Sequence, residues 1–210
     1  MASERDENVR LPRGSREQNY LPHADNPRPR LAIERLMEIN KNYPRAKCAK
    51  AFTSVQLQSF LTGAPDNEYL DVKVAAVLSI MGACQRIQLF DMTLAHITVR
   101  ETSLMITIPQ IKKSIARTFS VNTPWKEIVQ QYIQMRPEGT QHDFLFINYQ
   151  NGRCTPQKMS IMKIGRMPRR MAEYLQLPNP ETYTSHVFRK TSHALLANAG
   201  HNLATLLYIQ

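Results

Sequence analysis

The chain has 210 residues, of which 42% are hydrophobic and 21% are charged, a composition typical of folded globular proteins. This length suits one domain of ordinary size with a tail and excludes two substantial domains. Basic residues outnumber acidic ones by 27 to 17, so the net charge of +10 favours an anionic partner, nucleic acid ahead of an acidic membrane surface or a purely solubilising role.

Residues 1–45 predict a disordered tail. They are rich in Arg, Asn, Pro and Glu without periodicity, and only the stretch LAIERLMEIN, residues 31–40, has an apolar stripe that predicts a short helix. The start MASERDENVRLPRGSR lacks the apolar centre of a signal peptide. The tail holds 9 basic and 7 acidic residues, whereas residues 46–210 hold 18 and 10, so most of the excess positive charge belongs to the predicted domain.

The predicted domain begins with two helices. Thr53 and Gln56 have the spacing of a capping box, and Gly63 can end the helix that they start. A second helix is predicted from about Tyr69, where the run VKVAAVLSIMGAC is apolar nearly all round, as expected for a helix at the centre of a core. This apolar run is too short to span a bilayer.

A change to alternating polarity then predicts a small antiparallel sheet. Its three candidate strands are AHITVR, LMITIP and RTFSV, and residues 122–124 start a further helix whose apolar stripe ends near Pro137. A short strand in FLFINYQNGR and a turn at Asn151 and Gly152 follow.

The last third of the chain is again helical. The stretch MSIMKIGRMPRRMAEYLQL predicts a helix interrupted by Gly165 and Pro168. Another helix is predicted from about Ser185 to Gly200, and Asn202 can cap a final helix to Gln210. The predicted fold is therefore mainly α with a small antiparallel three-stranded sheet.

The cysteines favour a reducing compartment. Cys48, Cys84 and Cys154 are odd in number, far apart and in no paired motif, which indicates neither a disulfide framework nor a zinc site. We expect a soluble intracellular protein with no membrane partner.

His186 and Arg189 are the first indication of chemistry. They lie three residues apart near the start of a predicted helix, so both can reach one anion at the positive end of that helix. Taken alone, such a pair is more often a solvated face or a helix cap.

The surrounding stretches resemble the catalytic domain of tyrosine recombinases, most closely the Crypton type of mobile element. TSHVFRKTSHALLANAG resembles their second arginine box, GACQRIQLFDMTLAHI the first, and LMITIPQIKKSIARTFSV the hairpin that carries the family's lysine. The resemblance covers residues 52–210 and implies the fold of DNA breaking-rejoining enzymes for residues 46–210. It also implies that a tyrosine attacks a DNA phosphodiester without metal or cofactor, while arginines hold the phosphate oxygens.

The resemblance assigns roles to individual residues. Arg189 takes the second-arginine position, His186 the box-two histidine position, and Lys112 the hairpin-lysine position, for which Lys113 is an equally placed substitute. The expected partner is double-stranded DNA in the nucleus, and a homo-oligomer on DNA is compatible with the family. Further contacts to the DNA backbone are expected from Lys113, Lys190, Arg169 and Arg170.

Two departures from the family pattern predict impaired catalysis. The family's first arginine position holds Gln85 and its acidic position holds Gln88, while Arg86 is one residue late, about 100° around a helix. Losing one such donor costs roughly 10²- to 10³-fold in rate. The sequence also ends at Gln210, ahead of the family's third box and nucleophilic tyrosine, and Tyr208 does not match that tyrosine. We therefore expect a catalytic domain that is incomplete at its C-terminus.

Three functions remain open on the sequence. The first is a recombinase-derived DNA-binding domain that does not cut. The second is an active recombinase whose tyrosine comes from a partner chain. The third is a module that binds something other than DNA, or a fragment without stable folding, which thermal melting would distinguish.

Overall fold

The computed structural model describes residues 50–109 and 116–198, which lie in one compact unit, Lys47–Gln210. The predicted tail, the predicted helix over residues 31–40, the hairpin turn with Lys112 and Lys113, and the predicted last helix with Tyr208 fall outside the described residues. These predictions therefore stay predictions.

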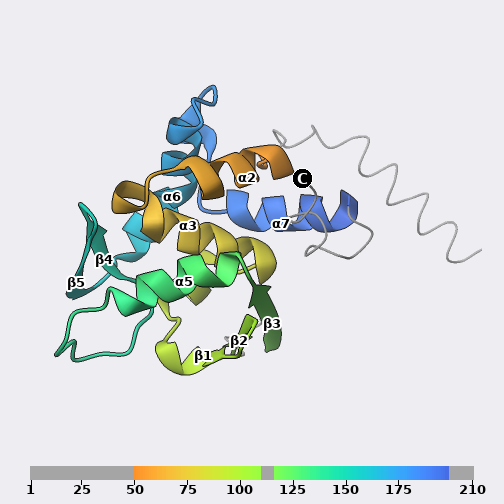
Figure 1. The fold of residues 1–210 in the computed structure, drawn as a ribbon. Helices are drawn as coiled ribbons and strands as arrows, with labels where there is room; N and C mark the ends of the chain where they lie inside the picture. The colour runs from red at the N-terminus through yellow and green to blue at the C-terminus, as the bar shows by residue number, and fades with distance from the viewer. Residues whose placement is uncertain (1–49, 110–115, 199–210) are drawn as a thin grey trace, which may run out of the picture. The chain divides into compact units, whose positions relative to one another are not determined.

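Two consecutive helices open the described part (Figure 1). Helix α2, Ser54–Gly63, begins at the predicted cap: Gln56 N donates to Thr53 Oγ1 at 3.2 Å, and Thr53 N donates to Gln56 Oε1 at 3.0 Å. Helix α3, Asp66–Met81, starts three residues earlier than predicted, and every residue from Leu70 to Ile80 is buried. The prediction of a central helix that is apolar nearly all round is confirmed.

The predicted three-stranded sheet is present. It follows the short helix α4, Arg86–Phe90, and the 3-10 turn η1, Leu94–His96. Strands β1, Ile97–Val99, β2, Ser103–Ile108, and β3, Arg117–Asn122, pair antiparallel in the order β1-β2-β3. In β2, Leu104, Ile106 and Ile108 are buried, so the alternating pattern places one face of the sheet on the core.

A second, two-stranded sheet follows helix α5, Trp125–Gln134. Strand β4, Ile147–Gln150, turns at Asn151 and Gly152, both with positive φ, into strand β5, Arg153–Lys158. Strand β5 was not predicted, because RCTPQK is polar, contains a proline and has no alternation of apolar residues. Tertiary contacts hold this hairpin: Tyr149 Oη donates to Asp66 O at 2.6 Å, and Gly152 N donates to Asn67 O, also at 2.6 Å.

Two helices complete the described chain. Helix α6, Ile161–Tyr174, is capped by Ser160 and runs unbroken through Gly165 and Pro168, so the predicted interruption is wrong. Pro168 removes one helical N–H, but Met167, Pro168 and Met171 are all buried, and this packing overrides the unfavourable propensity. After the 3-10 turn η2, Pro180–Thr182, helix α7 spans Val187–Asn198, close to its predicted start.

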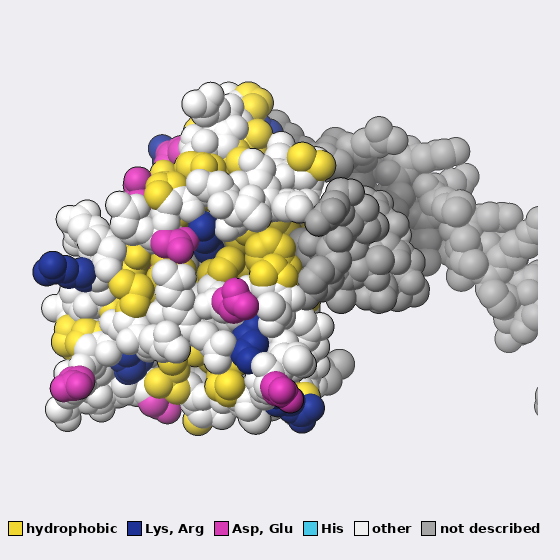
Figure 2. All heavy atoms as spheres, in the orientation of Figure 1, with side chains coloured by type: hydrophobic (Ala, Val, Ile, Leu, Met, Phe, Trp, Pro, Cys, Tyr) yellow, Lys and Arg dark blue, Asp and Glu magenta, His cyan; other side chains and the backbone are white. Residues whose placement is uncertain are grey.

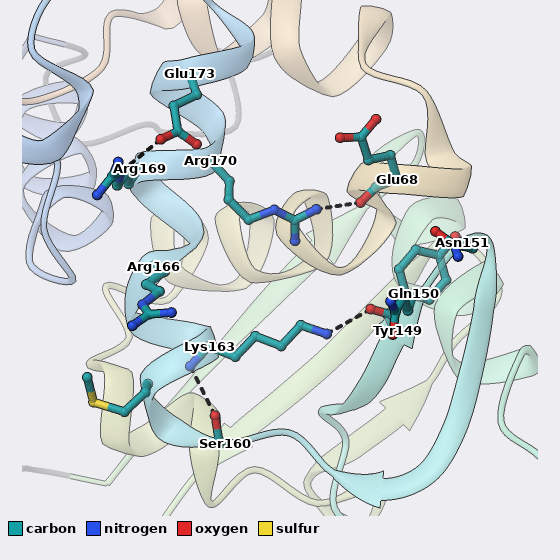
Figure 3. A pocket seen from close by; sticks show the side chains of 11 residues that line it. Glu68, Tyr149, Gln150, Asn151, Ser160, Lys163, Arg166, Arg169, Arg170 and Glu173 are labelled. Atoms are coloured by element: carbon teal, nitrogen blue, oxygen red, sulfur yellow. Dashed lines mark hydrogen bonds and ion pairs between the residues drawn. The ribbon is translucent and has the colours of Figure 1, made fainter.

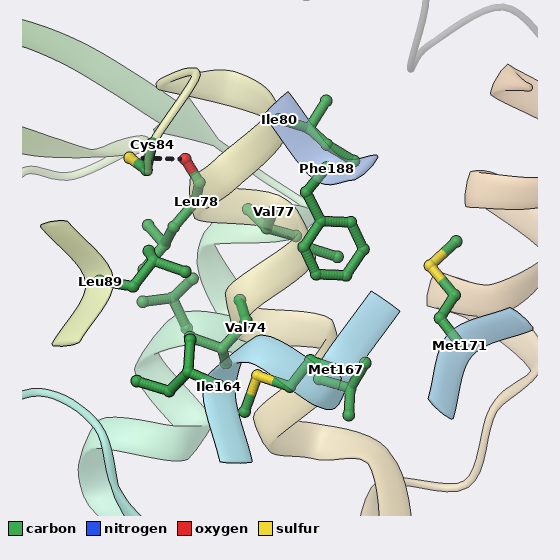
Figure 4. Close-up of a cluster of buried hydrophobic side chains, with 14 of the residues drawn as sticks. Val74, Val77, Leu78, Ile80, Cys84, Leu89, Ile164, Met167, Met171 and Phe188 are labelled. Carbon is green, nitrogen blue, oxygen red and sulfur yellow. Dashed lines mark hydrogen bonds between the residues drawn. The ribbon is translucent and has the colours of Figure 1, made fainter. Parts of the chain in front are cut away.

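Helix α3 is the centre of this unit and contacts α5, α6 and α7 (Figure 1). Figure 4 shows its apolar side chains, among them Val74, Val77 and Leu78, facing Met167 from α6 and Phe188 from α7. Helix α7 is fixed further by Thr191, whose Oγ1 accepts from Phe52 N and donates to Val187 O, both at 2.9 Å. The predicted fold class, mainly α with a small antiparallel sheet, is confirmed.

Candidate functional site

A pocket of about 370 Å³ lies where α4, the start of α6 and the start of α7 meet. We call it the α4–α7 pocket. It collects residues from the two stretches that resemble the family's first and second arginine boxes, about a hundred positions apart. Its lining consists of Gln85, Arg86, Ile87, Ile161, Ser185, His186 and Arg189.

The loop that presents Gln85 and Arg86 is braced by Arg117 at the start of β3. Arg117 Nε donates to Gly82 O at 2.8 Å, and Nη2 donates to Ala83 O at 3.2 Å and to Gln88 Oε1 at 2.9 Å. The same Gln88 oxygen accepts from Gln85 N at 2.9 Å. Gln88, at the family's acidic position, is therefore a buried acceptor that joins the loop to the three-stranded sheet.

Gly82 lets β3 come close to this loop. A Cβ at Gly82 would overlap the ring of Phe119, so no side chain fits here without movement of that ring. Because Phe119 belongs to the same strand as Arg117, glycine at this position permits the contact on which the brace depends.

Arg86 reaches the pocket by crossing α6 at Gly165. A Cβ at Gly165 would lie 3.0 Å from Arg86 Nη1 and 3.1 Å from Arg86 Cδ, and Ser185 Cβ lies 3.8 Å away. The offset of one residue from the family frame leaves Arg86 in the pocket, because α6 has no side chain where the arginine passes. Gln85 lines the same pocket, so the structure brings both first-box candidates to one place.

His186 and Arg189 enter the pocket from the N-terminal end of α7. Lys190 N donates to His186 O at 3.0 Å, the first helical bond of this end, while buried Val187 and Phe188 anchor the helix in the core. His186 is exposed and Arg189 is half-buried. Both residues therefore line the same pocket at the N-terminal end of α7.

The basic side chains of the pocket have no partners among the described residues. Within residues 50–109 and 116–198, the side chains of Arg86, His186 and Arg189 make no hydrogen bond and no ion pair. Two forked guanidinium groups and an imidazole around one hollow match the needs of a phosphate group, which accepts several charge-assisted hydrogen bonds. In the described part of the chain, no group of three or more His, Cys, Asp or Glu side chains could hold a metal ion.

The other residues predicted to contact DNA lie in different parts of the structure. Lys112 and Lys113 lie outside the described residues. Lys190 is exposed on α7 and lines neither this pocket nor the larger groove beside α6, whereas Arg169 and Arg170 line that groove. Arg170 is partly engaged by the fold, since its Nη1 lies 3.1 Å from Oδ1 of the fully buried Asp71.

The sequence patterns did not indicate the supporting residues. Arg117 and Gly165 have no motif of their own, and only the packing of β3 and α6 against the first-box loop gives them a role. Lys163 and Arg166 could have been found from helical spacing, because they precede Arg170 by seven and four residues on one helix.

The surface and the helices add one observation each. On the face shown in Figure 2, Lys and Arg side chains stand singly among acidic and neutral ones and form no continuous basic patch. None of the described helices combines the length and apolarity needed to cross a membrane.

Comparisons with known proteins point in one direction. The sequence model of the Phage integrase family matches residues 33–209. Among solved structures, the chain is similar to XerA recombinase, with a TM-score of 0.56 and 18% identity over 80% of this chain and 57% of that one. It is also similar to the Tn1549 transposon integrase in complex with a circular intermediate DNA, with a TM-score of 0.55 and 20% identity over 85% of this chain and 67% of that one.

A third similar structure is XerH site-specific recombinase bound to its difH substrate, with a TM-score of 0.53 and 12% identity over 73% of this chain and 43% of that one. The matched region thus spans about half of the two Xer recombinase chains. At these identities the likeness shows the fold, which is that of the tyrosine recombinase catalytic domain. No curated protein matches the sequence.

Proposed function

Because the chain belongs to the phage integrase family of tyrosine recombinases, we propose that its compact unit is a DNA-recombination module whose α4–α7 pocket holds a backbone phosphate of double-stranded DNA. The observation that carries the proposal is the meeting of Arg86, His186 and Arg189 in one pocket without partners among the described residues. Family and fold support a role in DNA recombination.

In the proposed arrangement, Arg86 takes over the first-arginine role from Gln85. The guanidinium groups of Arg86 and Arg189 donate to the non-bridging phosphate oxygens, and His186 donates to the same phosphate or accepts a proton from the attacking group. Lys112, or Lys113 in its place, remains our proposal for the acid that protonates the leaving oxygen. We further propose a Crypton-type, mobile-element origin and action in the nucleus, on the strength of the box-two resemblance.

A salt titration tests phosphate binding. A labelled duplex is titrated with the protein between about 50 and 200 mM salt, and log affinity should fall steeply as log salt rises. Arg189→Gln should weaken binding about 10- to 100-fold, since a hydrogen bond to a charged group contributes about 1.5–3 kcal/mol. Arg100→Gln is the matched control, because Arg100 is exposed and lines neither the α4–α7 pocket nor the larger groove beside α6. A flat titration would contradict the proposal.

We also propose that this unit by itself holds DNA without cutting it. Among the described residues, those that line the α4–α7 pocket include no tyrosine, and covalent cleavage requires one within reach of the phosphate. A nicked suicide substrate should therefore give no covalent protein–DNA adduct with this chain alone. An adduct formed by the chain alone would refute this part, whereas one formed only with a full-length recombinase added would favour a tyrosine supplied in trans.

A further inference from the structure

A second hollow of the described unit lies beside α6, on the side of β4 and the start of α3. We call it the α6 groove. It has a volume of about 810 Å³, and Figure 3 shows Lys163 and Arg170 extending across it from α6 toward Tyr149 and Glu68. Its lining consists of Glu68, Tyr149, Gln150, Asn151, Ser160, Met162, Lys163, Arg166, Arg169, Arg170 and Glu173.

Two of the four cations in this groove are held by the fold. Lys163 Nζ donates to Tyr149 O at 2.7 Å and so ties α6 to β4. Arg170 Nη2 donates to Glu68 O at 2.6 Å, and its Nη1 is bound to Asp71. Both side chains are thus positioned, and their charge still contributes to the potential inside the groove.

The other two cations are available to a ligand. Arg166 is exposed and makes no hydrogen bond or ion pair with any described residue, as its side chain without dashed lines in Figure 3 illustrates. Arg169 Nε is paired with Glu173 Oε1 at 2.8 Å, but both side chains are about half exposed. An exposed pair of this kind contributes little to stability, so Arg169 can exchange Glu173 for another anion.

The groove and the α4–α7 pocket open on neighbouring faces of one helix. At the start of α6, Ile161 lines the pocket, while the neighbouring Ser160 and Met162 line the groove. One turn later, Arg86 of the pocket passes over Gly165, and the next residue, Arg166, lines the groove. Met162 stands at this boundary with 58% of its surface exposed. A strand whose phosphate lies in the pocket can therefore continue across the first turns of α6 into the groove.

We propose that the α6 groove is a second subsite for the phosphodiester backbone of DNA, next to the phosphate held in the α4–α7 pocket, with Arg166 and Arg169 as its ligands. This inference rests on the proposed function. Arg166 and Arg169 lie one helical turn apart, with about 5–6 Å between such positions, so two long arginines can follow one strand. The neutral donors of Gln150 and Asn151 on the opposite wall suit a polar, hydrated backbone.

The test compares variants that change charge in the groove without touching the fold. Arg166→Gln/Arg169→Gln should weaken binding of a labelled duplex roughly tenfold and reduce the slope of log affinity against log salt by about 2, because each arginine neutralises one phosphate. Glu173→Gln should have the opposite effect, tightening binding by about two- to fivefold, because it removes a competitor for Arg169 and a negative charge. A purely structural role for these residues predicts no such gain.

Arg100→Gln is again the matched control, and unchanged thermal melting of each variant verifies folding. Absence of binding by the wild-type protein would overturn the proposed function and the groove with it. Wild-type binding that the double variant retains with the same salt slope would overturn the groove alone. Polyglutamate serves as a second probe, for an acidic polypeptide. If the double variant loses polyglutamate binding while its DNA binding is unchanged, the DNA subsite is overturned and the groove is assigned to an acidic polypeptide.

Discussion

The α4–α7 pocket and the α6 groove share one helix, yet their cations have different neighbours. In the pocket, Arg86 and Arg189 have no partner among the described residues. In the groove, Arg170 lies against the buried carboxylate of Asp71, and Lys163 donates to a backbone carbonyl. Basic residues of the pocket are therefore all available to a ligand, whereas two of the four in the groove, Lys163 and Arg170, also hold the fold together.

Burial explains this difference. Asp71 is fully buried on α3, and burial raises its pKa more than the Arg170 guanidinium lowers it. A carboxylate in such a place needs a fixed cation, so Arg170 is not free to follow a ligand. No described carboxylate faces the arginines of the pocket, which remain available.

Arg170→Met gives the sharpest test of the structural side. Removing the partner of a buried carboxylate should lower the free energy of unfolding by about 3 kcal/mol, measured by urea denaturation. Arg166→Met is the matched control on the same helix and should change stability by less than about 0.5 kcal/mol, because Arg166 has no described partner. Equal losses in the two variants would remove the distinction between the cations of the groove.

Arg86→Gln gives the corresponding test on the ligand side. It should weaken duplex binding about 10- to 100-fold while the melting temperature stays unchanged, since the guanidinium of Arg86 serves the phosphate and has no described protein partner. Gln85→Ala is the neighbouring control and should leave affinity within about twofold. A reversal of these two results would assign the phosphate contact to position 85, as the family frame has it.

Gly165→Ala should separate stability from binding. Replacing glycine inside a helix should stabilise the protein by about 0.5–1 kcal/mol, whereas the new Cβ, 3.0 Å from Arg86 Nη1, should displace the guanidinium and weaken duplex binding a fewfold. In an Arg86→Gln background the same substitution should no longer affect binding, because the displaced group is gone. A loss of affinity that persists in that background would show that Gly165 acts by another route.

The smallest expected effect concerns Lys163, whose contribution to the free energy of unfolding should depend on pH. Burial lowers its pKa from the ordinary value of 10.5, and this outweighs the opposite effect of Asp71. Between the lowered pKa and 10.5 the unfolded chain binds more protons than the folded one, so the contribution of Lys163 to the free energy of unfolding should rise with pH across that interval. The difference between wild type and Lys163→Met in urea denaturation at several alkaline pH values should show this rise, and a difference that falls with pH would contradict it.

Local patterns determined much of the fold from the sequence. The capping box at Thr53, the apolar run of α3 and the alternation in β2 each depend on residues close in the chain, and all three are confirmed. Strand β5 and the unbroken α6 could not be predicted in this way. Their local sequences are unfavourable, and contacts with residues distant in the chain hold them in place: Tyr149 beside β5 donates to Asp66 O, and Met167 of α6 is buried in the core with α3.

For the site, the sequence by itself determined which residue types are present and, through the box-two stretch, where His186 and Arg189 stand. Only the tertiary structure decided what Arg86 can reach, because that depends on a glycine of another helix 79 positions later in the chain. It also decided that Arg170 is held by Asp71 while Arg166 has no described partner. Helical periodicity gives the direction of a side chain, but the packing of separate elements decides what that side chain meets.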